Sequence, residues 1–391
     1  MKKIGLCIQF EGVDNYGTVL QAMANRKAIE DLGCETRIIR YKRKYDLSFI
    51  LNQLPRIFDL THWKIVIRRK KRKKALKNNK VFREHRHDSQ KAFKEYRKDF
   101  FPETCIDQFY GYDELRKKSC MYNAVLVGSD QLWLPTGLRS NFYNLMFAQD
   151  GVKRISYSTS FGVSSIPKVQ YKATKEYLNK IDYLSVREVA GQKIIRDLTG
   201  REAFLVCDPV MLLSSEEWNN ICNVIPLPKD MPEDDYLLCY FLGGNESSRR
   251  TAADAARKLG VKVVSISYMD DYFSVDDGFG DYVPSGIRPE QFVNLIKNAK
   301  YVMTDSFHGT AFSIIFEKQF LSTYRFDTES KLSKNSRIDN VLSKFNLMKR
   351  LYIHGDAASM FNDEIDYQSV TNIRDNWRKE SLAFLKNALG E

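Results

Sequence analysis

The sequence predicts an α/β protein of two domains, each a sheet of parallel strands covered by helices, that face each other across a cleft. Short apolar runs of strand length alternate with segments of helical periodicity in both halves of the chain. A break falls between the halves, because residues 225–235 contain three prolines and little periodicity. The 391 residues, 43% of them hydrophobic, are enough for two separate cores.

The first domain is expected to span residues 1–215. A buried strand is expected at 4–10, followed by a polar loop, a helix over 18–32 that Gly33 ends, and a strand at 36–41. This order is typical of a parallel α/β layer. Further strands are expected at 124–127, 155–158, 183–186 and 204–207, and helices at 168–180 and 189–198.

The second domain is expected over residues 235–345, where the alternation starts again. Ligands of open α/β sheets bind at the carboxyl ends of the strands, so the cleft between the domains is the expected site. A helical segment over 346–391 ends the chain, and its helix at 372–389 either completes the second domain or crosses back over the first. Strands of the second domain are expected at 236–241, 261–266, 301–303 and 320–324, and helices at 247–259, 289–299, 310–316 and 338–345.

A basic helical insertion is expected in the first domain, over about residues 42–100. The net charge of the chain is +12, and residues 64–98 alone hold sixteen lysines and arginines against three acidic residues. Two interpretations are open. The insertion is either a solvated helix or a segment that attaches to an anionic membrane surface, with residues 47–58 and 63–67 as apolar anchors. Nucleic acid is an unlikely partner, because no aromatic residues are interleaved through residues 68–80.

The seven cysteines form no CxxC or other metal-ligand spacing, which is typical of reduced, buried thiols in a cytoplasmic protein. No apolar run approaches the roughly 20 residues of a membrane span. The predicted location is the cytoplasm, with peripheral attachment to the inner face of the cell membrane as a further expectation. No cofactor and no metal site are expected, and His85 and His87 are placed on a solvated helix face. The sequence has no Walker, GxGxxG or GxSxG motif, which disfavours a kinase or a dinucleotide oxidoreductase.

Two polar loops of the first domain are candidate parts of the site. Asn15, Tyr16 and Gly17 lie between a strand and a helix, where backbone N–H groups attract anions; an ordinary capped turn is the alternative. Asp130 and Gln131 follow a buried strand in the run Gly-Ser-Asp-Gln-Leu-Trp. Asp130 is placed there to act as a base, or to cap the next helix.

Two further segments carry polar side chains at the ends of strands. Arg187 suits bidentate recognition of a carboxylate or phosphate, and the alternative is a surface ion pair with Glu188. His308 follows a buried strand and precedes an apolar helix, where it can hold a phosphate or transfer a proton. Ser306 and Gly309 flank it at the start of that helix.

Six blocks of the chain, outside the basic insertion, lie at residues 15–22, 128–133, 156–162, 185–188, 207–209 and 298–313. In this order they resemble the polysaccharide pyruvyl transferase family, over residues 4 to about 345. The resemblance implies a fold similar to the GT-B glycosyltransferases, with two Rossmann-like domains around a cleft. It also implies transfer of pyruvate from phosphoenolpyruvate onto two hydroxyls of a sugar, which forms a cyclic ketal and releases phosphate. Capsule or other exopolysaccharide synthesis, with a lipid-linked glycan as acceptor, is the expected setting.

The resemblance implies roles for individual residues. Arg187 matches an arginine at the carboxylate of phosphoenolpyruvate. His308 matches a histidine at its phosphate, where it can protonate the leaving group. Asp130 is the expected base for the acceptor hydroxyl. Glu188 ranks lower, because on a strand it would point away from Arg187.

One departure from the family concerns the phosphate. Some members carry Arg two residues before the histidine, where this chain has Ser306, so a second phosphate contact is expected from Arg325 or Arg337. The alternative function is a GT-B nucleotide-sugar glycosyltransferase, which predicts binding of a nucleotide sugar instead of phosphoenolpyruvate. A non-catalytic membrane-attached scaffold predicts that replacing Arg187 or His308 by Ala changes no activity.

Overall fold

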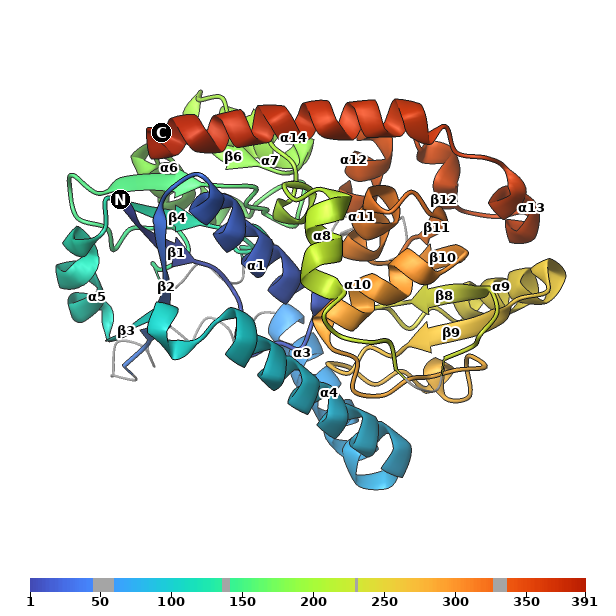
Figure 1. Cartoon of the computed structure of the whole chain (residues 1–391). Coiled ribbons are helices and arrows are strands. Elements are labelled where there is room, and N and C mark those ends of the chain that lie inside the picture. Colours follow the sequence, from blue (N-terminus) through green and yellow to red (C-terminus); the bar gives the residue numbers. More distant parts are fainter. Residues whose placement is uncertain (45–59, 136–140, 229–230, 326–335) are drawn as a thin grey trace.

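The computed structural model describes residues 1–44, 60–135, 141–228, 231–325 and 336–391 (Figure 1). Two parallel sheets, each packed against helices, stand beside each other, one built from each half of the chain. A long C-terminal helix runs across both. The predicted α/β class with two facing, GT-B-like domains is confirmed by this arrangement.

The first sheet has five parallel strands in the order β3-β2-β1-β4-β5. The four residues of β4 are all buried, as expected for a strand with helices on both faces. A short parallel pair, β6 and β7, extends the sheet beyond β5 through single bridges, one of them from Ile155 to Tyr183. The strands are β1 (Lys3–Cys7), β2 (Glu35–Lys42), β3 (Ile106–Tyr110), β4 (Ala124–Val127), β5 (Lys153–Ser156), β6 (Ser185–Val186) and β7 (Phe204–Leu205).

Helix α1 forms the first crossover of this domain. Asn15 is its N-cap and accepts a hydrogen bond from the backbone N–H of Thr18. Strand β3 and helix α5 were not predicted, because β3 is an edge strand in which only Ile106 and Phe109 are buried, so its apolar signal is weak. The helices of the first domain are α1 (Tyr16–Asp31), α5 (Tyr112–Lys118), α6 (Tyr171–Lys180) and α7 (Val189–Thr199).

The second sheet has five parallel strands in the order β12-β11-β10-β8-β9. Counted within the domain, this is the doubly wound order 2-1-3-4-5 read from the other edge, whereas the first sheet follows the Rossmann order 3-2-1-4-5. The two sheets therefore differ in how their strands are ordered along the chain. The elements are β8 (Tyr236–Tyr240), α9 (Glu246–Leu259), β9 (Lys262–Ile266), α10 (Pro289–Asn298), β10 (Tyr301–Thr304), α11 (Phe307–Ile315), β11 (Gln319–Thr323), α12 (Ser336–Lys344), β12 (Leu351–Tyr352) and α13 (Ala357–Asn362).

The predicted end of the second domain at residue 345 is too early. Strand β12 pairs with β11 and α13 packs beside α9, so the domain extends to about residue 362. Helix α14 (Tyr367–Leu389) then crosses back to the first domain (Figure 1). There the hydroxyl of Ser381 accepts a hydrogen bond from the N–H of Cys207 (2.9 Å), and the indole of Trp377 donates to the carbonyl of Leu205 (3.2 Å).

The two domains share one continuous core. The ring of Tyr16 in α1 stacks on Phe292 of α10, with ring centres 4.5 Å apart. The predicted break between the domains contains helix α8 (Ser215–Cys222), whose Trp218 packs edge-on against Phe312 of α11 at 4.9 Å. Helix α8 therefore belongs to the interface between the domains, whereas the described residues between α8 and β8 (223–228 and 231–235) are exposed or half-buried.

The basic insertion is a helical hairpin, α3 (Leu60–Asn78) and α4 (Lys80–Phe100), that projects from the body of the molecule (Figure 1). One face of α4 is buried, and Arg288 of the second domain bonds Asp99 at 2.7 Å. The hairpin therefore bridges the two domains. The apolar stretch predicted as an anchor over 47–58 lies outside the described residues. His87 is exposed as expected, but His85 is half-buried.

Candidate active site

The two sheets reverse their strand order at points that face each other. The reversal falls between β1 and β4 in the first sheet, and between β8 and β10 in the second. Ligands of open α/β sheets bind at such points. The loops that follow these four strands line a pocket of about 280 Å³, together with residues that follow β9 and β11 and with Arg337 of α12. Of the residues predicted for the site, Asn15, Asp130, Gln131, Ser306, His308, Arg325 and Arg337 line this pocket, whereas Tyr16, Gly17, Arg187, Glu188 and Gly309 are not among its lining residues.

His308 enters the pocket from the first turn of α11. Its ring lies directly against α1, where a Cβ added to Gly17 would overlap Nδ1 and Cγ of the imidazole. Glycine at position 17 therefore makes room for His308. The Nε2 atom lies 3.7 Å from Oδ1 of Asp208 and accepts or donates no hydrogen bond among the described residues. This nitrogen is buried, with the carboxylate of Asp208 as its charged neighbour.

Arg187 lies behind the pocket, where it is 5% exposed. Its guanidinium donates to Oδ2 of Asp208 at 2.7 Å, and carboxylate oxygens of Glu188 and Asp130 lie at 3.7 and 3.8 Å. Its Cζ also lies 4.9 Å from the ring centre of Phe307 at the start of α11. The cation is already compensated by protein carboxylates, so this position does not favour the predicted role of Arg187 at the substrate carboxylate.

The alternation of a strand predicted that Glu188 points away from Arg187, but its carboxylate lies 3.7 Å from the guanidinium of Arg187. Strand β6 ends at Val186, so the alternation of a strand does not reach residue 188. The Glu188 carboxylate is buried and accepts a short hydrogen bond from the hydroxyl of Ser160. The surface ion pair considered from the sequence is therefore a buried one.

Asp208 is a site residue that sequence reasoning did not single out. It is 1% exposed and accepts hydrogen bonds from Arg187 and from the hydroxyl of Ser129 (2.8 Å). Burial acts to raise its pKa, but the positive charges of His308 and Arg187 outweigh burial and hold the pKa well below its ordinary value. Its signals in the sequence are an acidic residue between an apolar strand and Pro209, and its place in the family block at residues 207–209, to which no role was assigned.

Asp130 lies on the first-domain side of the pocket, with a left-handed backbone at φ 80°. Such a conformation is costly outside glycine and is often found at functional sites. Its carboxylate accepts hydrogen bonds from the hydroxyl of Thr18 (2.9 Å) and the N–H of Gln131 (2.8 Å). Burial raises its pKa, but nearby cations, Arg187 first among them, lower it below the ordinary value. Asp130 is therefore ionised at neutral pH.

Arg325 and Arg337 supply the cations of the second-domain side. The guanidinium of Arg325 donates to the carbonyl of Asp305 at 3.0 Å and lies 3.5 Å from its carboxylate. Among the described residues no carboxylate forms an ion pair with Arg337, and its Nε is buried without a partner. Burial, then the charges of Arg187 and Arg325, lower the pKa of Arg337 to about 10. An anion bound beside Arg337 would offset the unfavourable burial of its charge and the repulsion from Arg187 and Arg325.

The helices that border the pocket are capped or closely packed by three of the predicted site residues, Ser306, Gly309 and Asn15. The hydroxyl of Ser306 caps α11 by accepting from the N–H of Gly309 (3.3 Å), and Asn15 caps α1. A Cβ on Gly309 would lie 2.7 Å from the hydroxyl of Thr304, so glycine is required there by packing against β10. Gln131 is different, because its Nε2 is buried in the pocket wall with no partner among the described residues.

Tyr16 was predicted in the cleft, but its ring lies in the core between the domains. It is 5% exposed, and its hydroxyl donates to the carbonyl of Ile287 at 3.2 Å. An aromatic ring with a satisfied hydroxyl gains more from this apolar contact than from the polar pocket. Tyr16 therefore packs between the two domains and is not among the residues that line the pocket.

No group of side chains with the composition of a metal site occurs in the described part of the chain. Within the same residues, no helix is both long and apolar enough to cross a membrane. The seven cysteines form no disulfide, and all but Cys120 are buried.

The chain is thus an α/β protein of two doubly wound sheets, with a pocket of opposed charges between the two sheets. The model of the polysaccharide pyruvyl transferase family matches residues 15–325. The chain belongs to this family. It is therefore a transferase of polysaccharide synthesis with a sugar as acceptor.

Solved structures with a similar course of the chain come from sugar-nucleotide enzymes. UDP-GlcNAc 2-epimerase from Neisseria meningitidis, bound to UDP-GlcNAc, is 11% identical with a TM-score of 0.47, covering 97% of this chain and 94% of that chain. MurG from Acinetobacter baumannii is 9% identical with a TM-score of 0.44, covering 97% and 95%. At these TM-scores the likeness adds nothing to the topology described above. No match was found among proteins with curated functions.

Proposed function

We propose that this transferase takes pyruvate from phosphoenolpyruvate and joins it to two hydroxyls of a sugar as a cyclic ketal, releasing phosphate. The reaction belongs to the synthesis of a surface polysaccharide, a capsule or exopolysaccharide, with a lipid-linked glycan as acceptor. Membership of the family supports the transfer of pyruvate to a sugar. The charges of the pocket support the choice of donor.

The observation that carries the proposal is the cation of Arg337, with which no carboxylate of the described residues forms an ion pair. Its Nε is buried without a hydrogen-bond partner among those residues and its pKa is lowered to about 10, so an anion bound beside it would stabilise the charged guanidinium. Phosphoenolpyruvate brings a carboxylate and a phosphate. Arg325, Arg337 and His308 together offer cationic or donor groups to both, from one side of the pocket. These residues replace Arg187 as the proposed donor contacts.

The chemistry requires two hydroxyl protons to be moved. The first sugar hydroxyl adds to C2 of phosphoenolpyruvate, and its proton ends on C3, which becomes the methyl group. The second hydroxyl displaces phosphate from C2; the C2–O bond breaks, its electron pair leaves with phosphate, and the second proton passes to that phosphate. Atoms and charge balance with no oxidant or reductant.

Two side chains on opposite domains are proposed to act in this reaction, one in proton transfer and one as a fixed charge. His308, whose Nε2 makes no hydrogen bond among the described residues and lies 3.7 Å from the carboxylate of Asp208, is the proposed acid for the departing phosphate. Asp130 faces it as an ionised carboxylate. A carboxylate with a lowered pKa holds a proton weakly. Asp130 therefore orients the acceptor hydroxyls and stabilises the positive charge that develops at C2.

Binding of phosphoenolpyruvate is the direct test. A ligand present at a hundredfold its Kd adds about 2.7 kcal/mol to the free energy of unfolding. We expect phosphoenolpyruvate to raise the Tm of the wild type, and to raise it much less in Arg337→Met and His308→Ala. Differential scanning fluorimetry over a range of phosphoenolpyruvate concentrations measures this. The matched control is Arg83→Met, which removes an exposed arginine of α4 and should leave the shift intact.

The same experiment separates the alternatives. A shift of equal size in Arg337→Met and wild type would contradict the proposed donor site. A shift with UDP- or GDP-sugars and none with phosphoenolpyruvate would favour the glycosyltransferase instead. Transfer itself is followed as release of inorganic phosphate and as a new ketal methyl signal in the NMR spectrum of the acceptor.

We also propose that the hairpin attaches the protein to an anionic membrane surface. Ten cations among the described side chains of this hairpin are exposed, and the apolar side chain of Ile67 on α3 is 52% exposed. Each Lys or Arg near an anionic lipid surface contributes about 1 kcal/mol. A lipid-linked acceptor would be reached from such a position. The exposed cations are Lys70, Lys71, Lys73, Lys74, Lys77, Lys80, Arg83, Lys91, Lys94 and Lys98.

Vesicle sedimentation tests this attachment. Wild-type protein is expected to sediment with phosphatidylserine-containing vesicles at low salt, and to remain in solution with pure phosphatidylcholine. Replacing four hairpin lysines (70, 71, 73 and 74) by Gln should abolish sedimentation, because about 4 kcal/mol of attraction is removed. The control replaces four exposed lysines of the body by Gln, namely Lys117, Lys118, Lys172 and Lys175. Equal sedimentation of both variants would mean that the hairpin is only a solvated helix.

A further inference from the structure

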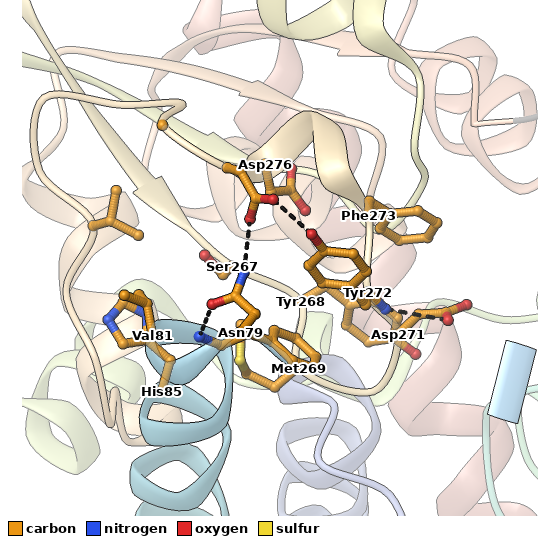
Figure 2. A pocket seen from close by; sticks show the side chains of 14 residues that line it. Asn79, Val81, His85, Ser267, Tyr268, Met269, Asp271, Tyr272, Phe273 and Asp276 are labelled. Carbon is orange, nitrogen blue, oxygen red and sulfur yellow. Dashed lines mark hydrogen bonds between the residues drawn. The ribbon is translucent and has the colours of Figure 1, made fainter. Parts of the chain in front are cut away.

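A second cavity, of about 300 Å³, lies between the start of α4 and the loop that follows β9 (Figure 2). Figure 2 shows Asn79 and His85 of the hairpin on one side, and Tyr272 and Asp276 of the loop on the other. We call this cavity the hairpin pocket. It is distinct from the candidate active site but adjoins it, because Tyr268 lines both.

One short stretch of the loop separates the two cavities. Met269 lines the hairpin pocket, and the next residue, Asp270, lines the candidate active site. The stretch is held from both sides: the guanidinium of Arg72 in α3 donates to the carbonyl of Asp270 (2.7 Å), and the N–H of Asp14 donates to its carboxylate (3.2 Å). The guanidinium of Arg86 also bonds the carbonyl of Met269. The hairpin therefore shapes the cavity as well as covering it.

The walls of the hairpin pocket combine aromatic rings with hydrogen-bond acceptors. Phe82, Tyr272 and Phe273 give it flat apolar faces. Asp277 accepts from the hydroxyl of Tyr272 (2.6 Å) and from the amide of Asn79 (3.4 Å), so its charge is spread over a network. Aromatic faces pack on the C–H faces of a sugar ring, while carboxylate and amide groups bind its hydroxyls.

The same lining disfavours a phosphorylated ligand. Among the described residues that line the hairpin pocket none is Lys or Arg, and three are aspartates. One of them, Asp276, is paired with Arg249 at 2.7 Å, and that arginine is itself buried outside the lining. A nucleoside diphosphate or a second phosphoenolpyruvate would meet carboxylates here without a cation to offset them. A neutral polyhydroxy ligand meets no such penalty.

We propose that the hairpin pocket binds a sugar residue of the acceptor glycan, next to the residue that receives pyruvate in the candidate active site. The position of this sugar next to the residue that receives pyruvate rests on the proposed function. A cavity of about 150 Å³ takes one benzene ring, so the hairpin pocket has room for a pyranose with its hydroxyl groups. The basic insertion thereby acquires a second role, as a wall of the acceptor site.

Filling the cavity from α4 tests the proposal. His85 is half-buried at the cavity wall, and His87, two residues further along the same helix, is exposed. We therefore compare His85→Trp with the matched control His87→Trp. The probes are the methyl glycosides of glucose, galactose, mannose, N-acetylglucosamine and N-acetylmannosamine, with the disaccharides lactose and cellobiose, measured by saturation-transfer NMR without phosphoenolpyruvate.

We expect at least one of these glycosides to bind wild type and His87→Trp equally, and to bind His85→Trp about tenfold more weakly, because the indole occupies its place. Equal binding to all three proteins, or no binding of any probe at millimolar concentration, would overturn the proposal. The Tm shift with phosphoenolpyruvate is measured on the same proteins. A normal shift in His85→Trp with loss of glycoside binding supports the inference, whereas absence of the shift in the wild type contradicts only the proposed donor.

Discussion

Replacing Gly17 by Ala is expected to lower the rate of pyruvyl transfer about 100-fold while the protein stays folded. Elsewhere in a helix this substitution would add up to about 1 kcal/mol of stability, since Ala is the better helix former. At this position the new Cβ would overlap the imidazole of His308. His308 must then move, and a displacement of about 1 Å in a catalytic group can cost about 100-fold. The measurement is the rate of phosphate release from phosphoenolpyruvate at saturating acceptor.

A double-mutant cycle separates this clash from a general effect on the helix. In a His308→Ala background no imidazole is present, so Gly17→Ala should change neither the residual rate nor the Tm by much. The two substitutions are thus expected to be strongly non-additive. If Gly17→Ala lowered the rate by the same factor in both backgrounds, the contact with His308 would not be the cause.

The largest effect on stability is expected for Asp208→Asn, which should lower the free energy of unfolding by about 3–5 kcal/mol. Removing one partner of a buried ion pair leaves the other charge uncompensated, and such losses fall in that range. In this variant the charge left behind is Arg187, which is 5% exposed and bonds Asp208 at 2.7 Å. Urea denaturation at pH 7 measures the change.

The control for this prediction is Asp197→Asn, which breaks the exposed pair with Lys193 on α7 (2.9 Å). Exposed pairs of this kind contribute about 0.3–0.5 kcal/mol. The midpoint of urea unfolding of Asp197→Asn should therefore stay close to the wild-type value. Similar losses in both variants would mean that the buried cluster contributes no more than a surface pair.

The effect of Asp208→Asn should also depend on pH. The folded-state pKa of Asp208 lies below its ordinary value, so its contribution to stability is complete above the ordinary carboxylate pKa near 4 and is lost as the pH falls through the folded-state pKa. The difference in the free energy of unfolding between wild type and Asp208→Asn should therefore be constant from about pH 5 to 7 and become smaller below about pH 4. A difference that grew on acidification would contradict the assigned charge state.

Much of the fold follows from local pattern. Strands such as β4 and β10 are continuous apolar runs followed by polar loops, and each was predicted within a residue or two. The weakly apolar edge strand β3 was missed, because an edge strand buries only part of one face. The strand orders of the two sheets, and the return of α14 to the first domain, depend on contacts between distant segments that no local window contains.

The candidate site was also predicted from the sequence only in part. His308 and Asp130 were predicted because each follows a buried strand, and the carboxyl ends of parallel strands are where ligands bind. Arg187 was predicted on the same ground, yet it is enclosed by the carboxylates of Asp208, Glu188 and Asp130. Which charges neutralise one another depends on three-dimensional distances, and Asp208 carried too little signal in the sequence to be placed beside Arg187.

Patterns in the sequence were enough to predict the α/β class, the two domains, the family and the strand ends at which the chemistry-bearing residues lie. These features depend on short-range periodicity and on the order of residues along the chain. Three other features were seen only in the folded chain: Gly17 gives room to His308, Arg337 forms no ion pair with a carboxylate of the described residues, and the basic hairpin closes a second cavity. Those facts depend on the meeting of two domains, because steric fit and charge compensation are set by distances between residues far apart in sequence.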